Sequence, residues 1–406
     1  MSHIAFVIPG LDRIGGAERQ VIALAAGLSR RGWTVTTIVL TGDGGAAREA
    51  LRAMGVDFVS LRMRKGLGDP RGWWRMHGWL RTNRPDVVHA HLPHAIFLAR
   101  WSRLAAAVPV VVDTVHTSRT AAGGQRLGFR ISRFLSDCST AVSGSAARAW
   151  IGDGLISAAK SLVLPNGIDV DRWKPDAEAR ARMRAELGVG DGFVWLAAGR
   201  LEAVKNPAAL LDAMALLPPS SRLYIAGSGP LEQALREQAA ALELTERVQF
   251  LGFVQDLLPW MQAADGVALA SRWEGLPLVL LEAAACGLPA VATDVAGSRD
   301  AIVEGKTGYL CTPGDAAALA AAMQHIERMR EEDRAAMGAR AQAHAQSAFS
   351  LTKILDQWEA VYRNLLLHRM QATHWARRIA LLPIEGGGAE SPLAPAPAPA
   401  SAAEME

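Results

Sequence analysis

The stretch EGLPLVLLEAAACGLPAVATDVAG, residues 274–297, reads as a loop, a helix and a strand in close succession. Pro277 is expected at the first helical position, where proline loses no hydrogen bond because that amide would be unpaired anyway. The run Ala290–Thr293 has the length and residue types of a buried strand. A helix followed by a short apolar strand indicates a parallel sheet covered by helices.

The same alternation extends from this stretch toward both ends of the chain. Strands are predicted at His3–Ile8, Thr34–Leu40, Phe58–Leu61, Val87–Ala90, Val110–Thr114, Val194–Ala198, Arg222–Ile225, Val248–Leu251, Gly266–Leu269, Ala290–Thr293 and Gly308–Leu310. Helices are predicted at Ala17–Arg31, Ala46–Met54, Trp73–Thr82, Ala95–Ala106, Pro207–Leu216, Pro230–Leu242, Ala316–Ser350 and Leu351–Met370. Turn residues at Asn166–Pro175 interrupt the alternation, so the chain is expected to form two domains.

The predicted regions are a Rossmann-like domain at 1–170, a second Rossmann-like domain at 171–350, C-terminal helices at 351–382 and a tail at 383–406. The tail is rich in Gly, Ala and Pro and is expected to be disordered. Open parallel sheets bind ligands beyond the carboxyl ends of their strands. Two facing sheets therefore place the expected site in the cleft between them.

Composition argues against several classes of protein. Three cysteines, Cys138, Cys286 and Cys311, lie far apart, which argues against a zinc site or a disulfide framework and suits a reducing compartment. The start MSHIAFVIPG lacks the basic segment of a secretory signal, and no run approaches the ~18–20 apolar residues of a spanning helix. We therefore expect a cytoplasmic protein.

Charge is distributed unevenly. Residues 1–170 contain 21 Lys and Arg against 11 Asp and Glu, whereas the remainder contains 22 against 29, so the first half is expected to meet an anionic partner. Within it, the stretch Arg62–Arg84 interleaves basic residues with Trp73, Trp74 and Trp79. One interpretation is a surface helix on an anionic membrane, and the other is a solvated helix whose tryptophans pack inward. Nothing else in the chain supports nucleic-acid binding.

Two carboxylates beside a helix start carry the main chemical hypothesis. Glu274 precedes the helix and Glu282 lies within it, among apolar residues where a carboxylate is costly unless something binds it. Free amides at the helix start, Gly275–Leu278, favour a phosphate group. By spacing alone, a helix with a favourable acid near its start and a solvated glutamate stays open as the alternative.

Cations follow another predicted strand. Arg200 and Lys205 come after Val194–Ala198, where they could neutralise a diphosphate, although a solvated pair of cations in a loop is an open alternative.

Histidines gather in the first half. His116 follows the strand Val110–Thr114 and is either structural or catalytic. His89, His91 and His94 have a spacing that suggests metal ligands, but no matching acid or cysteine cluster accompanies them, so no metal is expected.

Taken together, these motifs resemble the retaining GT-B glycosyltransferases of family 4, whose signature contains two glutamates separated by seven residues. The resemblance extends over Ile4–Arg369. The other motifs, in the family's order, are GGAER at Gly15–Arg19, PNGID at Pro165–Asp169, GRLEAVKN at Gly199–Asn206, GSGP at Gly227–Pro230 and LGFVQD at Leu251–Asp256. Gly297–Ser298 stand where many relatives have two glycines, a departure that concerns local contacts to the donor.

The resemblance implies a GT-B architecture: two facing Rossmann-like domains, a central cleft and a C-terminal helix that crosses back to the first domain. The C-terminal domain would hold the nucleotide-sugar and the N-terminal domain the acceptor, with no metal or other cofactor. Arg200 and Lys205 would stabilise the leaving diphosphate, and Glu274 and His116 would orient the sugar. These four are the catalytic candidates. The candidates for substrate binding are Gly15, Gly16, Asn166, Gly227, Gly229, Phe253, Val254, Gly275, Leu276, Pro277, Leu278 and Glu282, the last of which would hold the ribose.

The sequence thus predicts a retaining glycosyltransferase that moves a hexose or N-acetylhexosamine from a nucleotide-sugar, preferentially a UDP-sugar. The expected acceptor is a glycan or a lipid-linked molecule of bacterial cell-envelope polysaccharide synthesis, reached at the inner face of the cytoplasmic membrane. Two alternatives stay open: a nucleotide-sugar epimerase or hydrolase of the same architecture, and a non-catalytic sugar-nucleotide-binding protein. A nicotinamide dehydrogenase is disfavoured because the first loop, PGLDRIGGAE, lacks the GxGxxG spacing.

Overall fold

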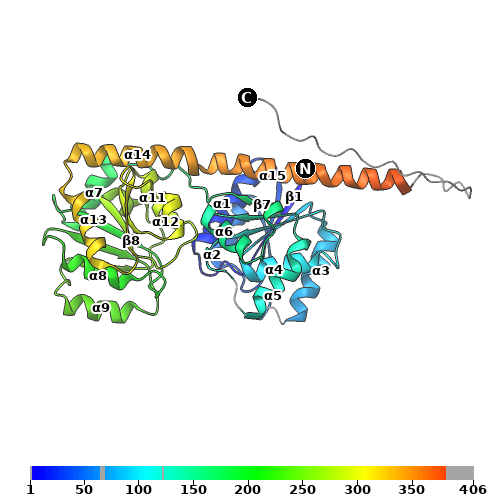
Figure 1. The fold of residues 1–406 in the computed structure, drawn as a ribbon, viewed down its shortest axis with the longest axis horizontal. Helices are drawn as coiled ribbons and strands as arrows, with labels where there is room; N and C mark the ends of the chain where they lie inside the picture. Colours follow the sequence, from blue (N-terminus) through cyan, green and yellow to red (C-terminus); the bar gives the residue numbers. More distant parts are fainter. Residues whose placement is uncertain (1, 65–68, 121–122, 381–406) are drawn as a thin grey trace, which may run out of the picture. The chain divides into compact units, whose positions relative to one another are not determined.

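The computed structural model describes residues 2–64, 69–120 and 123–380, with side chains to residue 371. The chain divides into two compact units, Met1–Leu366, which holds both sheets, and Leu367–Glu406. Helices lie on both faces of each sheet (Figure 1). The predicted α/β class with two Rossmann-like sheets is confirmed, whereas the predicted tail at 383–406 lies outside the described residues.

Seven parallel strands form the first sheet, in the order β3-β2-β1-β4-β5-β6-β7. They are β1 (His3–Ile8), β2 (Thr34–Val39), β3 (Asp57–Ser60), β4 (Val87–His91), β5 (Val110–Val115), β6 (Cys138–Ala141) and β7 (Ser161–Val163). Their connections contain α1 (Gly16–Arg30), α2 (Gly45–Ala53), α3 (Pro70–Asn83), α4 (Pro93–Ser102), α5 (Gly123–Ser132), η1 (Arg133–Leu135), α6 (Gly144–Gly152) and η2 (Ala158–Lys160). The strand order reverses between β1 and β4, so the loops after these strands flank a switch point, the usual ligand position in such sheets.

Six parallel strands form the second sheet, in the order β10-β9-β8-β11-β12-β13. They are β8 (Val194–Ala198), β9 (Arg222–Ala226), β10 (Val248–Gly252), β11 (Gly266–Leu269), β12 (Ala290–Thr293) and β13 (Gly308–Cys311). The helices are α7 (Ala177–Leu187), α8 (Pro207–Ala215), α9 (Glu232–Ala241), α10 (Leu258–Ala263), α11 (Leu278–Ala285), α12 (Ala296–Ala301), α13 (Ala316–Arg328) and α14 (Glu331–Phe349). Here the reversal falls between β8 and β11, which brings the loops carrying Lys205 and Glu274 side by side.

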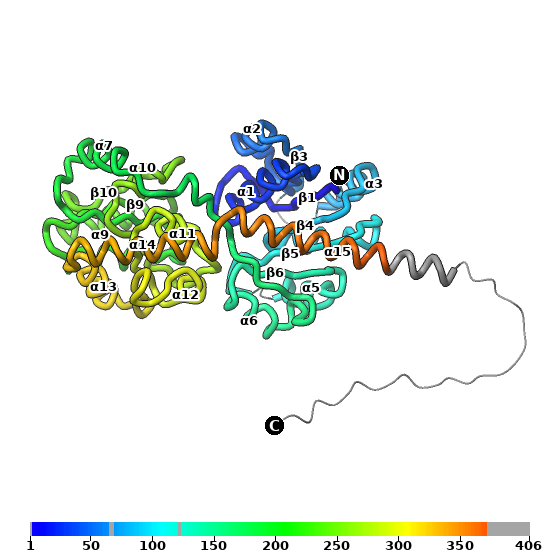
Figure 2. Tube along the Cα trace, turned by 90° about the horizontal axis from the view of Figure 1, so that it is seen from above, coloured from blue at the N-terminus to red at the C-terminus, as the bar shows by residue number. Residues whose placement is uncertain are grey.

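The last helix, α15 (Leu351–Ala380), returns to the first sheet, as the resemblance implied. Ile354, Leu355, Trp358 and Tyr362 are buried in the core built around β1 and α1. Figure 2 shows the first part of α15 running across the first half of the chain after α14 has run along the second.

The chain passes between the sheets twice, and the two passages are bonded to each other. Ile168 on the way out donates its amide to the carbonyl of Phe349 at 2.7 Å, and Leu351 on the way back donates to the carbonyl of Ile168 at 2.8 Å. Ile168 and Ser350 thereby form an isolated parallel bridge.

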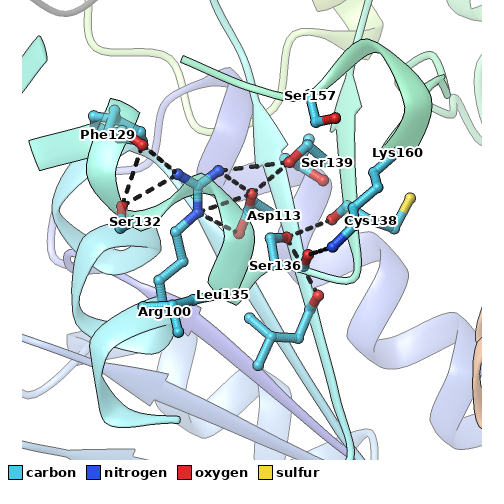
Figure 3. Close-up of polar contacts among 12 residues, drawn as sticks. Arg100, Asp113, Phe129, Ser132, Leu135, Ser136, Cys138, Ser139, Ser157 and Lys160 are labelled. Atoms are coloured by element: carbon cyan, nitrogen blue, oxygen red, sulfur yellow. Dashed lines mark hydrogen bonds and ion pairs between the residues drawn. The ribbon is translucent and has the colours of Figure 1, made fainter. Parts of the chain in front are cut away.

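A buried ion pair organises the α4–α5 side of the first sheet (Figure 3). The guanidinium of Arg100 donates to the carboxylate of Asp113 at 2.5 Å, and both side chains are fully buried. Arg100 also donates to the Phe129 carbonyl, and Ser139 donates to the same carboxylate at 2.8 Å. Because buried charges are stable only when paired and hydrogen-bonded, this pair fixes α4 and the end of α5 against β5.

Several sequence predictions need correction. The segment Ala316–Ser350 is two helices, because the chain leaves the helical conformation at Met329 and Arg330. The helix at Ala95–Ala106 begins at Pro93 and ends at Ser102. Pro277 was expected at the first helical position, but its backbone is extended and it is the N-cap residue of α11, which begins one residue later at Leu278. Among the described residues, no helix is long and apolar enough to cross a membrane.

Candidate active site

Glu282 lies on α11 with no exposed surface and forms an ion pair with Arg19 of α1. Burial raises the pKa of this carboxyl, and the Arg19 guanidinium opposes the rise. Its second oxygen, Oε2, is buried without a hydrogen-bond partner among the residues that the structure describes. An unpaired buried carboxylate oxygen is costly, so this position favours a ligand hydroxyl that donates a hydrogen bond.

Glu274 lies in the loop after β11, where two groups converge on its Oε1 atom. Lys205 Nζ, from the loop after β8, lies 2.5 Å away, and the Ser271 hydroxyl donates at 2.6 Å. Glu274 is nearly buried, whereas a quarter of the Lys205 side chain is exposed. The switch point thus holds one carboxylate and one cation in direct contact.

The loop between Glu274 and α11 rests against the first half of the chain. Ser118 donates to the carbonyl of Glu274 at 3.0 Å, and Asn166 donates to the carbonyl of Leu276 at 3.0 Å. A Cβ built on Gly275 would lie 2.0 Å from the carbonyl oxygen of His116, so glycine is required for this approach. The loop before α11 is therefore held against the first half by two side-chain donors and one close backbone contact.

Glycine also allows close packing around this loop, and the two neighbouring helix starts lie in contact. A Cβ on Gly297 would lie 2.5 Å from the carbonyl of Gly275, and the neighbouring Ser298 is fully buried. Gly15 caps α1, and a Cβ on Gly16 would lie 3.9 Å from Leu278 at the first position of α11. The N-termini of α1 and α11 thus adjoin, and each favours negative charge.

Arg200 is the most exposed of the predicted catalytic side chains, with 70% of its surface open, and it pairs with Glu202 at 2.9 Å. Gly227 and Gly229 support the loop that carries it. A Cβ on Gly227 would lie 1.9 Å from the carbonyl of Gly199, and one on Gly229 would lie 2.4 Å from that of Leu201. The structure thus explains these two glycines by loop packing, and their predicted contact with a nucleotide stays a prediction.

Phe253 and Val254 follow β10 at the edge of the second sheet, and Phe253 is 71% exposed. Their predicted role in recognising the base stays a prediction.

Three histidines lie close together, two on β4 and one directly after β5. His116 Nε2 is 2.9 Å from Nδ1 of His91, and the rings of His91 and His89 lie 4.1 Å apart. Both nitrogens of His89 are occupied, by Tyr362 of α15 and Thr114 of β5. Burial lowers the pKa of His116 to about 4 and the pKa values of His89 and His91 well below the ordinary histidine value.

His94 is exposed on α4 and does not join the buried His89 and His91. Within residues 2–64, 69–120 and 123–380, no group of three or more His, Cys, Asp or Glu side chains is placed to hold a metal ion.

Sequence reasoning missed two residues of this site. Arg19 closes the quoted motif GGAER, and one helical turn beyond the glycine loop it could have been proposed as the partner of Glu282. His91 was considered as a metal ligand, whereas the structure makes it the partner of His116.

Comparisons with known proteins agree with this architecture. The profile described as "Glycosyl transferases group 1" matches residues 179–344, and that described as "Glycosyltransferase Family 4" matches residues 14–172. A glycogen synthase of Mycobacterium tuberculosis is 34% identical over 333 residues, which cover 75% of this chain and 70% of that protein. The N-acetyl-alpha-D-glucosaminyl L-malate synthase of Bacillus anthracis is 29% identical over 69% of this chain and 75% of its own length.

A solved structure is similar along nearly the whole chain. The crystal structure of Anabaena HepE in complex with UDP has a TM-score of 0.79 and 25% identity, and the match covers 90% of this chain and all of that one.

Proposed function

The chain belongs to glycosyltransferase family 4 and is a GT-B glycosyltransferase that uses a nucleotide-sugar donor, and from this premise we propose that its donor is a UDP-sugar carrying a hexose or N-acetylhexosamine. The similarity to a protein crystallised with UDP supports the choice of nucleotide. The observation that carries the proposal is the meeting of Glu282, Glu274 and Lys205 with the N-termini of α1 and α11. Glu282 would match the ribose diol and Glu274 the sugar hydroxyls, whereas Lys205 and the two helix N-termini would match the diphosphate.

We propose that Glu282 Oε2, the unpaired oxygen, accepts a hydrogen bond from the ribose. Arg19 occupies the other oxygen, where its guanidinium opposes the rise in the pKa of this carboxyl and holds the side chain in place. Lys205 and Arg200 would bind the diphosphate together with the amides at the start of α11, which requires no metal ion.

The proposed reaction retains configuration. The bond between the anomeric carbon and the phosphate oxygen breaks, and its electron pair leaves with the nucleoside diphosphate. The acceptor hydroxyl attacks from the same face, and its proton passes to the departing phosphate oxygen. Lys205 and the helix amides would stabilise the negative charge that develops on that oxygen.

The donor assignment is tested by measuring release of nucleoside diphosphate from a panel of UDP-, GDP- and ADP-sugars, with and without acceptor glycans. UDP release that depends on an acceptor is expected. Lys205→Ala should lower kcat by about 100- to 1000-fold, the usual effect of removing one charge-stabilising donor. Arg236→Ala is the matched control, because Arg236 forms an exposed ion pair with Glu232 on α9. Turnover to an isomerised sugar nucleotide without acceptor would instead favour an epimerase.

We further propose that the acceptor is a glycan or a lipid-linked molecule of envelope polysaccharide synthesis, met at the inner membrane surface. The segment Arg62–Arg84, one interpretation of which is a membrane contact, supports the membrane location in part. Trp73 packs against Phe97 of α4 and Trp79 is half-buried, which leaves Trp74, 75% exposed, as its outward ring. Residues 65–68 of this stretch lie outside the described part of the chain.

The neighbouring segment α5–η1 adds an apolar stripe. Leu127, Ile131 and Phe134 are exposed at helical spacing i, i+4 and i+7. α4 lies between α3 and α5 and contacts both of them (Figure 1). Three arginines flank the stripe. Arg126 donates to the carboxylate of Asp153, whereas Arg130 and Arg133 donate to the backbone carbonyls of Asp153 and Gly154. One carboxylate faces three guanidinium groups, so net positive charge lies beside the stripe.

Co-sedimentation with vesicles tests the membrane contact. Binding is expected to vesicles that contain anionic lipid at low salt, and to weaken in Ile131→Asp with Phe134→Asp. Leu216→Asp, at an equally exposed leucine beyond α8, is the matched control. Equal binding of both variants, or no binding by the wild type, would contradict the contact without affecting the donor assignment.

A further inference from the structure

The hydrogen bond between His91 and His116 joins the ends of two adjacent strands. His91 is the last residue of β4 and is fully buried, and His116 follows β5 and is partly exposed. The bond joins His91 Nδ1 to His116 Nε2 at 2.9 Å. It therefore leaves Nδ1 as the ring nitrogen of His116 that is available to another group.

Both rings are neutral at physiological pH. Burial lowers the pKa of His116 to about 4 and that of His91 well below the ordinary histidine value, with the neighbouring histidines acting on His91 in the same direction. A neutral imidazole carries one proton, so one nitrogen donates and the other accepts. In this pair one ring is therefore the donor and the other the acceptor.

The second nitrogen of His91 shows which ring donates. Its Nε2 is buried and has no hydrogen-bond partner in the described part of the chain. If His91 carried its proton on Nε2, a buried N–H would stay unpaired, which is rarer in folded proteins than an under-used acceptor. The proton is better placed on Nδ1, from where it is donated to His116.

His89 packs against the ring of His91 and is itself fixed by hydrogen bonds. The Thr140 hydroxyl donates its one proton to the carbonyl of Asp113, because a carbonyl can only accept. Thr140 therefore accepts from the Thr114 hydroxyl, and Thr114 accepts from Nε2–H of His89. Nδ1 of His89 then accepts from the Tyr362 hydroxyl at 2.7 Å. The His89 ring, whose centroid lies 4.1 Å from that of His91 at an interplanar angle of 41°, is thus fixed at both of its nitrogens.

We propose that His91 is a positioning residue: its Nδ1–H donates to Nε2 of His116 and holds His116 as the Nδ1–H tautomer, which presents a hydrogen-bond donor to an oxygen of the bound sugar. The assignment of that oxygen to the sugar rests on the proposed function. The assignment of the tautomer does not.

Nitrogen NMR of protein labelled with ¹⁵N-histidine tests the tautomer without any substrate. His116 is expected to show its proton on Nδ1, against the preference of free histidine for Nε2–H. The His116→Ala variant assigns the signal. A proton on Nε2 of His116 in the wild type would overturn the proposal even if the enzyme is fully active.

Variants test the consequence for catalysis. His91→Phe removes the donor and is expected to lower kcat about tenfold, the value of one well-placed hydrogen bond, with a smaller change in the KM for the donor. His91→Asn keeps an N–H close to the position of Nδ1 and should restore most of kcat. His325→Phe is the matched control, because His325 shares a hydrogen bond with Tyr309 on the outer side of the second sheet.

A double-mutant cycle separates positioning from general support of the fold. If His91 acts through His116, His91→Phe should have little further effect in the His116→Ala background. If His91→Phe lowers kcat by the same factor in both backgrounds, its role is merely structural and the proposal is overturned. If His91→Phe does not fold, the NMR result and the activity of His91→Asn decide. A folded His91→Asn enzyme that is as inactive as His116→Ala would contradict the proposal.

Discussion

Replacing Arg100 by Met should destabilise the first half of the chain strongly. The substitution leaves the Asp113 carboxylate with no exposed surface and Ser139 as its remaining side-chain donor. It also removes one of the side-chain donors to the Phe129 carbonyl, which leaves the Ser132 hydroxyl. Breaking one side of a fully buried pair costs about 3–5 kcal/mol, because the remaining charge is uncompensated.

The assay is thermal and urea unfolding followed by a probe in the first half of the chain. For a domain of this size each kcal/mol lowers Tm by about 2–4 °C, so a fall of roughly 6–20 °C is expected. Replacing both partners, Arg100→Met with Asp113→Leu, should recover most of the loss, since well-packed apolar residues often substitute for a buried pair without cost.

The double variant provides the critical comparison. Coupling of the two sites means that the pair together costs less than the sum of the single variants. A single variant within about 1 kcal/mol of the wild type, or losses that simply add, would refute the view that this pair fixes α4 and α5 against β5.

Three further predictions concern the site. Burial lowers the pKa of His116 in the folded chain to about 4, below its unfolded value, so the unfolded chain binds more protons between these values. The free energy of unfolding should therefore decrease as the pH drops from 6.5 toward 4. Calorimetry at pH 7 and pH 5 should show a decrease that is roughly 1–2 kcal/mol smaller in His116→Phe than in the wild type. Gly275→Ala places a Cβ 2.0 Å from the His116 carbonyl and should lower kcat/KM for the donor at least about tenfold, which steady-state kinetics would detect, whereas Gly78→Ala, with open space around it, should change nothing. Incubation with EDTA should leave turnover unchanged, because Lys205, Arg200 and the helix amides are proposed to bind the diphosphate; activity restored by Mg²⁺ after EDTA would contradict this.

The sequence predicted most strands because their apolar runs are continuous, as in β1, β5 and β8. It did not predict β6 or β7. β6 reads CSTA and β7 is three residues long, so neither has the β-branched apolar run that marks a buried strand. Tertiary pairing, of β6 with β5 and of β7 with β6, decides their conformation.

The sequence singled out Glu274, Glu282 and Lys205 as candidates, and their roles stay predictions, but it did not indicate that Arg19 would pair with Glu282. Arg19 and Glu282 are 263 residues apart in sequence, and their contact depends on how two separately built sheets meet. The state of His116 likewise depends on a neighbouring strand, since His91 reaches it through the pairing of β4 with β5. Local pattern cannot report either contact.

The bridge between Ile168 and Ser350 has a mechanical consequence. Since the outgoing and returning chains are bonded to each other where they pass between the sheets, they cannot bend independently. Two joined chain segments act as one hinge with a defined axis, and they resist twisting more than a single linker would. Opening of the two halves to admit a donor is therefore expected to be a rotation about Ile168–Ser350, which would carry Arg19 away from Glu282 while leaving each sheet unchanged.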